Sequence, residues 1–330
     1  MNLLLFLVIV SSFLSLSSLT WWCAWLSMEF SLVWLYPILS LEFSGSKKSS
    51  LWSFFLFQSV SSVLLFLCFM ATPSFIDLNT CQFTFWISLF LLLLKMGFPP
   101  FHSWYLELCD SVSSTGFILI NTVVKLPPLW LCFGVYSLAV SSHVMLMVLC
   151  LSSLFSLSGL SSFSYRRMMI YSSFVNYVWG LASMGLSVSA FVTFFLNYFI
   201  PFLTFWFMLS NFVQNPCSTL PAGKLKESLS VVFMASWLSL SGLPPFGLFF
   251  AKALVAYELS CLSDLHWVLT LCLAFVSTLM MWIYLSLGFA IFLWSSSMFI
   301  LSKKEKSGWS TLTLVYTLLV ASIMTPLALF

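Results

Sequence analysis

Charged residues are scarce in this sequence. They make up 6% of its 330 residues, whereas hydrophobic residues make up 61%. A soluble domain contains about 25% charged residues, so the composition excludes that class of protein. A helix needs about 20 apolar residues to cross the hydrocarbon core of a bilayer. We therefore expect an all-α polytopic membrane protein, and the chain length leaves room for about eleven transmembrane helices with short loops.

Residue clusters that bind metals or redox centres are also missing. No two of the nine cysteines form a Cys-x-x-Cys pattern, and iron–sulfur clusters are held by grouped cysteines. No His/Cys spacing typical of a metal site and no glycine-rich phosphate-binding loop is present. We expect no metal, no cofactor and no redox centre on this chain, and no nucleic-acid partner.

The apolar runs predict eleven helices. Their approximate bounds are residues 3–19, 21–43, 51–71, 80–104, 113–139, 144–160, 168–186, 190–210, 228–259, 265–294 and 309–327. The fourth and the ninth contain the same motif, Gly-x-Pro-Pro-Phe, starting at Gly97 and at Gly242. Proline cannot continue the hydrogen-bond ladder of a helix. Both helices are therefore expected to be discontinuous, at Pro99-Pro100 and at Pro244-Pro245.

The basic residues in the loops between these runs are predicted to lie on one side of the membrane. Nine of the twelve Lys and Arg residues follow the second, sixth, eighth or tenth predicted helix: Lys47, Lys48, Arg166, Arg167, Lys224, Lys226, Lys303, Lys304 and Lys306. The intervening loops carry Asp77 and Asp264 but no Lys or Arg. Basic loops lie on the inner side of a membrane. The pattern supports eleven spans, with the N-terminus on the basic side and the C-terminus on the other.

Four ionisable residues fall inside the predicted spans: Glu29, Lys95, Lys125 and Lys252. A charge at mid-membrane costs about 2.5–3.5 kcal/mol, and such residues usually mark an ion path. A buried lysine changes its proton affinity readily with its surroundings, so a lysine beside a glutamate can act as a switchable proton carrier. Two other interpretations stay open. The lysines can snorkel from helix ends, or they can form structural ion pairs without transport.

The two helix breaks lie beside two of these lysines. Lys95 precedes the first break and Lys252 follows the second. Interrupted helices in corresponding halves of a transporter point to its ion path. His102 lies inside the first break, where we expect it either to relay protons or to hydrogen-bond the broken helix.

The motifs around these residues resemble subunit 2 of mitochondrial NADH:ubiquinone oxidoreductase, a family of antiporter-like membrane subunits of respiratory complex I. The family's segment K-x-G-x-x-P-F-H-x-W is matched by KMGFPPFHSW, which begins at Lys95. Its segment G-L-P-P-F is matched by GLPPF, which precedes Lys252. Its early L-E-M-type helix is matched at Met28-Glu29, and its T-x-x-K-x-x-P helix by TVVKLPP, which contains Lys125. The resemblance covers nearly the whole chain in order.

This resemblance implies a single antiporter-like transmembrane domain over residues 1–330. Two inverted repeats, about 1–140 and 143–296, would each contain a discontinuous helix, and a final helix would span about 309–327. The resemblance also implies roles for the buried residues. Glu29 and Lys95 would form a modulating pair, Lys125 would be the central relay, and Lys252 would face the exit side.

The function that the resemblance implies is proton translocation in the membrane arm of complex I, coupled to electron transfer from NADH to ubiquinone. The chain would be an enzyme only as a subunit, because NADH, FMN, iron–sulfur clusters and ubiquinone would bind to other subunits. Its expected partners are the other membrane-arm subunits, including other antiporter-like ones, and phospholipids. The expected location is the mitochondrial inner membrane, with the N-terminus on the matrix side and the C-terminus on the intermembrane-space side. A free-standing cation/proton antiporter of the same fold and a structural assembly subunit without transport remain as alternatives.

Overall fold

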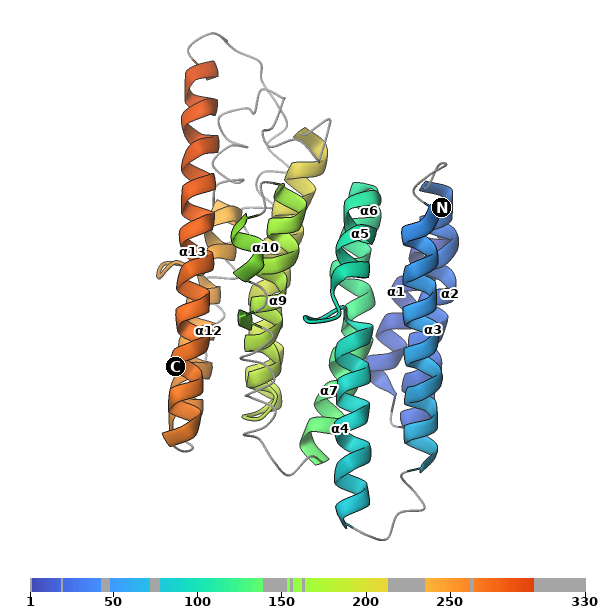
Figure 1. The fold of residues 1–330 in the computed structure, drawn as a ribbon. Coiled ribbons are helices and arrows are strands. Elements are labelled where there is room, and N and C mark those ends of the chain that lie inside the picture. Colours follow the sequence, from blue (N-terminus) through green and yellow to red (C-terminus); the bar gives the residue numbers. More distant parts are fainter. Residues whose placement is uncertain are drawn as a thin grey trace. The chain divides into compact units, whose positions relative to one another are not determined.

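The computed structural model describes residues 2–18, 20–42, 48–71, 78–138, 153–154, 157–161, 164–212, 235–261 and 264–299. These residues form helices with short connections and contain no strand, so the predicted all-α class is confirmed. The chain divides into two units, Met1–Met145 and Leu146–Phe330 (Figure 1). Each unit contains one of the two Gly-x-Pro-Pro-Phe motifs.

The first unit is a bundle of helices. Its elements are α1 (Asn2–Ser17), α2 (Trp21–Glu42), α3 (Lys48–Ala71), α4 (Leu78–Lys95), α5 (Ser103–Ser111), α6 (Ser114–Asn121), the 3₁₀ turn η3 (Val123–Lys125) and α7 (Leu126–Leu138). Helix α1 packs against α2, and α3 packs against α4 and α5 (Figure 1). Helix α7 contacts α1, α2 and α4. Residues of η3 and α7 therefore reach the interior, where Lys125 and Leu129 are buried.

The first Gly-x-Pro-Pro-Phe motif ends α4 at Lys95, as the sequence predicts. The N–H of Phe98 donates to the carbonyl of Leu93 across 3.0 Å, and the N–H of Gly97 donates to that of Leu94 across 2.9 Å. This pair of bonds is the Schellman motif, whose residue after the helix takes the left-handed conformation that favours glycine. Gly97 has a φ of 71°. The chain then turns through the prolines before α5 begins.

A second interruption separates α6 from α7. The sequence predicts one helix over residues 113–139, but α6 ends at Asn121 and a 3₁₀ turn follows at Val123–Lys125. Pro127 and Pro128 lie in the first turn of α7, where their missing N–H groups remove no helical bond. A helix continuing from α6 would lose those two bonds. The interruption places Lys125 on a turn instead of inside a regular helix.

The second unit is organised around α9. Its elements are η4 (Leu157–Ser161), α9 (Tyr165–Ser183), α10 (Val188–Phe212), a helical segment over 235–241, α12 (Gly247–Ser260) and α13 (Asp264–Phe299). Helix α9 contacts η4, α10, α12 and α13, and every residue from 168 to 184 is buried. Helices α10 and α13 instead expose large apolar side chains such as Leu196 and Trp282. Helix α9 is therefore the core of this unit, and α10 and α13 provide apolar outer surface.

The start of α9 differs from the sequence prediction. The predicted helix begins near residue 168, with Arg166 in the preceding loop, but α9 begins at Tyr165. Arg166 lies in its first turn and is buried, with its guanidinium carbon 6.0 Å from the centroid of the Trp206 ring in α10. The basic loop residue thus becomes part of the packing between two helices.

Five described segments are long and apolar enough to cross a membrane: Trp21–Leu41, Ser49–Met70, Ser114–Val135, Val188–Phe207 and His266–Ser286. They support a multi-pass membrane protein. The predicted span 309–327 and most of the predicted span 144–160 lie outside the described residues. The count of about eleven spans and the inverted relation of the two repeats stay predictions.

Candidate functional site

Glu29 and Lys95 form an ion pair inside the first unit. The Nζ of Lys95, at the end of α4, donates to Oε1 of Glu29, in α2, across 2.6 Å. The lysine side chain is 2% exposed and the glutamate side chain 26%. A charge this deep in a protein needs a partner and hydrogen bonds to persist. Lys95 therefore does not snorkel, and the structure brings two of the predicted residues into contact.

The backbone of Lys95 is held as well as its side chain. The Nε2 of Gln58, in α3, donates to the carbonyl of Lys95 across 2.8 Å. The last carbonyls of a helix have no partner within the helix, so this bond satisfies one of them. The C-terminal end of a helix also carries partial negative charge, which stabilises a cation there. Both effects fix the point from which the Lys95 side chain extends.

Lys125 lies over an aromatic ring. Its Nζ is 4.3 Å from the centroid of the Tyr105 ring, and the lysine is buried. An ammonium over a ring face gains about 2 kcal/mol when both groups are out of water. The hydroxyl of Tyr105 donates to Oδ1 of Asn121 across 2.6 Å, which fixes the ring in place beneath Lys125.

The first helix break supports the same ring. A Cβ at Gly97 would lie 2.8 Å from Cγ of Tyr105, so the ring packs directly on the glycine. The break therefore does more than end α4. It also makes the space for the aromatic ring under Lys125.

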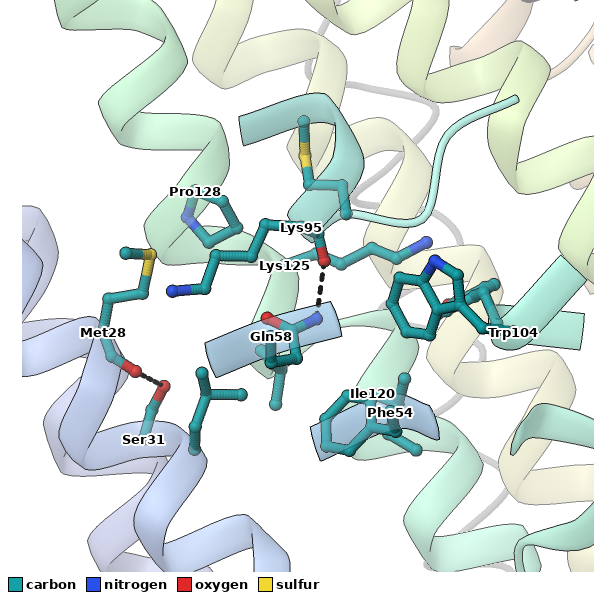
Figure 2. A pocket seen from close by; sticks show the side chains of 13 residues that line it. Met28, Ser31, Phe54, Gln58, Lys95, Trp104, Ile120, Lys125 and Pro128 are labelled. Carbon is teal, nitrogen blue, oxygen red and sulfur yellow. Dashed lines mark hydrogen bonds between the residues drawn. The ribbon is translucent and has the colours of Figure 1, made fainter. Parts of the chain in front are cut away.

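Lys95 and Lys125 line one small pocket (Figure 2). The space open to the centre of a water molecule is ≈ 20 Å³, and a bound water needs about 10–15 Å³. Figure 2 shows the two lysine side chains extending in opposite directions, Lys95 toward Met28 and Lys125 toward Trp104. The pocket that both lysines line therefore has room for a water molecule.

The chemistry of this pocket suits protons better than bound metal cations. No group of three or more His, Cys, Asp or Glu able to hold a metal ion occurs in the described part of the chain. Hard cations need several oxygen ligands, whereas Lys95 and Lys125 present ammonium groups, which donate only. Lysines that differ in their surroundings can instead hold and release a proton.

Lys252 lies at the helix break of the second unit. Gly242 has a φ of 77°, and a Cβ there would lie 3.6 Å from Nζ of Lys252. The lysine on α12 therefore folds back onto the break that precedes its helix. Over the described ranges no carboxylate pairs with it, in contrast to the contact between Lys95 and Glu29.

His102 bonds to the first break itself. Its Nδ1 lies 3.2 Å from the carbonyl oxygen of Pro100. Because a carbonyl only accepts, Nδ1 is the donor. The side chain is half-buried and does not line the pocket of the two lysines. This contact fits the expectation that His102 hydrogen-bonds the broken helix.

Gln58 and Tyr105 are part of the site, although the sequence analysis missed both. Gln58 is the one amide in the apolar helix α3. A buried amide without a hydrogen bond costs about 2–7 kcal/mol, so its position alone implies a partner. Tyr105 gives no such signal, because its contacts with Gly97, Asn121 and Lys125 come from three separate parts of the fold.

Two replacements of Tyr105 separate its two contacts. Tyr105→Phe keeps the ring but leaves the buried Oδ1 of Asn121 with one bond fewer, which is expected to cost about 1–3 kcal/mol. Tyr105→Leu also removes the ring under Lys125 and is expected to cost about 2 kcal/mol more. Thermal unfolding of the detergent-solubilised assembly measures both. Equal losses in the two variants would contradict a stabilising contact between the ring and Lys125.

Curated proteins with similar sequences share one name. The chain is 28% identical to NADH-ubiquinone oxidoreductase chain 2 of Anopheles gambiae over 334 residues, covering 96% of this chain and 93% of that protein. It is 26% identical to the protein of the same name in Dugong dugon, covering 98% of this chain and 95% of that protein. No protein-family model matches the chain.

Two solved structures that share this fold are chains of larger complexes. A chain of respiratory complex I from Thermus thermophilus with bound aureothin has a TM-score of 0.79 at 18% identity, covering 98% of this chain and 77% of that chain. A chain of the Mrp complex from Dietzia sp. DQ12-45-1b also has a TM-score of 0.79, at 14% identity, covering 98% and 74%. At such identities the likeness shows the fold alone. Sequence relatives and fold agree with the motif resemblance and confirm it: the homologues of this chain are NADH-ubiquinone oxidoreductase chain 2 proteins.

Proposed function

We propose that this chain is a proton-translocating membrane-arm subunit of respiratory complex I, which couples electron transfer from NADH to ubiquinone to proton pumping. The observation that carries the proposal is the lysine site of the first unit. An ion pair and a second buried lysine adjoin one water-sized pocket beside a helix break. Buried ion pairs seldom add stability over apolar residues of similar volume. An assembly role alone therefore does not account for the buried charges.

Glu29 and Lys95 control the first step in this proposal. While the pair is intact, Glu29 keeps the proton on Lys95. When Glu29 is neutralised or moves away, Lys95 becomes a buried charge without a counterion, which costs about 3–5 kcal/mol. The proton then leaves Lys95 for Lys125 through the pocket. Moving one charge against 100 mV requires about 2.3 kcal/mol, so loss of the pair is sufficient to drive this step.

Lys125 then passes the proton toward Lys252, which releases it on the exit side. The absence of a carboxylate partner for Lys252 among the described residues suits a release site, because none of those carboxylates favours the protonated lysine. His102 takes part as a further relay only when its Nδ1 bond to Pro100 opens.

The proposed setting of the chain follows from this role. NADH, FMN, iron–sulfur clusters and ubiquinone bind other subunits, and this chain contacts other membrane-arm subunits, antiporter-like ones among them, and phospholipids. It lies in the mitochondrial inner membrane, with its N-terminus on the matrix side and its C-terminus on the intermembrane-space side. Recovery of the chain as a homo-oligomer that exchanges cations for protons would contradict this setting and favour a free-standing antiporter.

Replacing Lys125 tests the relay. Lys125→Met keeps a long unbranched side chain but removes the ionisable group. The substitution touches no redox group. The assembled complex is therefore expected to oxidise NADH, in the presence of an uncoupler, at a rate within about twofold of the parent. A tenfold loss would correspond to an activation free energy about 1.4 kcal/mol higher. The number of protons translocated per NADH is expected to fall. An unchanged ratio in a normally assembled complex would refute the relay role of Lys125.

A further inference from the structure

Gln58 lines the pocket and has a polar atom that no group in the described part of the chain satisfies. Its Nε2 donates to the carbonyl of Lys95 across 2.8 Å. A carbonyl oxygen only accepts, so this bond fixes the orientation of the amide and directs Oε1 away from that carbonyl. Gln58 is 5% exposed, and among the described residues no donor bonds to its Oε1.

Trp104 presents the opposite kind of group to the same pocket (Figure 2). Its Nε1–H is buried and has no acceptor within the described ranges. About 90% or more of the buried polar groups in proteins are hydrogen-bonded, either to protein or to ordered water. An unsatisfied acceptor and an unsatisfied donor at one pocket therefore require molecules that can both donate and accept.

Water meets that requirement, and the pocket has room for it, as its ≈ 20 Å³ exceeds the about 10–15 Å³ that a water needs. We propose that Gln58 is a positioning residue of the lysine site. Its Oε1 accepts a hydrogen bond from a water molecule in the pocket that Lys95 and Lys125 line, and its Nε2 fixes the end of α4 from which Lys95 extends. This inference rests on the proposed proton relay and adds the group that places water between its first two lysines.

The neutral charge of Gln58 is part of its role. The titratable groups that face the pocket are Lys95, Lys125 and Tyr105, and Glu29 is bound to Lys95. An amide oxygen orients water beside an ammonium without adding a charge. A carboxylate at the same place would instead compete with Glu29 and hold a lysine in its protonated state.

The test compares assembled complexes that carry the parent chain, Gln58→Met and the control Ser62→Ala. Ser62 is a buried residue of the same helix that does not line the pocket. Cryo-electron microscopy at a resolution that shows ordered water is expected to find density within hydrogen-bond distance of Oε1 in the parent and in the control, and none in Gln58→Met. The protons translocated per NADH in Gln58→Met are expected to fall by at least half of the loss seen with Lys125→Met, while the control keeps the parent ratio.

Three results would overturn the proposal: no water density in the pocket of the parent, a lysine ammonium bonded directly to Oε1, or a number of protons translocated per NADH in Gln58→Met equal to that of the parent. If Gln58→Met does not assemble, Gln58→Glu takes its place, because the carboxylate has the same shape. A positioning role predicts a lowered ratio for Gln58→Glu at a near-parental rate of NADH oxidation. A purely structural role instead predicts that the yield of assembled complex and the oxidation rate fall together, because a carboxylate cannot donate to the carbonyl of Lys95. If Lys125→Met lowers the number of protons translocated per NADH and Gln58→Met does not, the inference about Gln58 is refuted and the proton relay stands. If Lys125→Met leaves that number unchanged, the proton relay itself is refuted.

Discussion

Gly97→Ala is expected to destabilise the first unit by about 2–5 kcal/mol and to deplete the assembled complex. The left-handed backbone at this position costs a residue with a Cβ roughly 1–2 kcal/mol. The new Cβ would also lie 2.8 Å from Cγ of Tyr105. That ring is buried and bonded to Asn121, so it cannot shift without breaking another contact. Overpacking of this kind costs about 1–3 kcal/mol.

Gly242→Ala is the matched control for this prediction. Gly242 has almost the same backbone conformation, with a φ of 77°, but a Cβ there would be 3.6 Å from its nearest neighbour, Nζ of Lys252. Only the backbone strain is expected, roughly 1–2 kcal/mol. The yield of assembled complex and its unfolding temperature compare the two variants. Equal losses would show that the contact between Gly97 and Tyr105 contributes nothing.

Glu29→Gln is expected to destabilise the first unit by about 3 kcal/mol. It leaves Lys95, whose side chain is 2% exposed, as a buried charge without a counterion, and such a loss costs about 3–5 kcal/mol. The lower end applies because Glu29 is 26% exposed and part of its interaction is screened by its surroundings. Lys95→Met is expected to cost less, because the carboxylate left behind is the more exposed partner.

The double variant Glu29→Gln/Lys95→Met completes the cycle. Replacing both members of a buried pair is often neutral for stability, so its unfolding temperature is expected to lie near that of the parent. The sum of the two single losses should exceed the loss in the double variant. Additive losses would mean that the 2.6 Å contact does not couple the two residues.

Much of the site could be predicted from sequence because its charges stand out. A glutamate and a lysine in separate apolar runs each need a partner, which made Glu29 and Lys95 visible as candidates. The end of α4 was equally visible, since a glycine followed by two prolines cannot continue a helix. The turn at Val123–Lys125 could not be predicted from the sequence, because prolines in a first helical turn do not reveal where the preceding helix stops.

The aromatic support of Lys125 could not be predicted for a different reason. Aromatic residues make up 19% of the chain, so one more tyrosine carries no information by itself. Its role depends on three contacts that exist only once the break, α6 and η3 are folded together. The role of Gln58 could not be predicted either. Its partner is a backbone carbonyl 37 positions away, and the carbonyl at any other helix end could have accepted the same hydrogen bond.

The proton-to-NADH ratio of the double variant Glu29→Gln/Lys95→Met tests the central claim most directly. This variant removes the pair that is proposed to drive the proton to Lys125 but is expected to keep the fold. The ratio is measured in sealed vesicles that contain the assembled complex, beside the rate of NADH oxidation with an uncoupler. The proposed relay predicts a lower ratio at a near-parental oxidation rate, and a parental ratio in the stable double variant would contradict it.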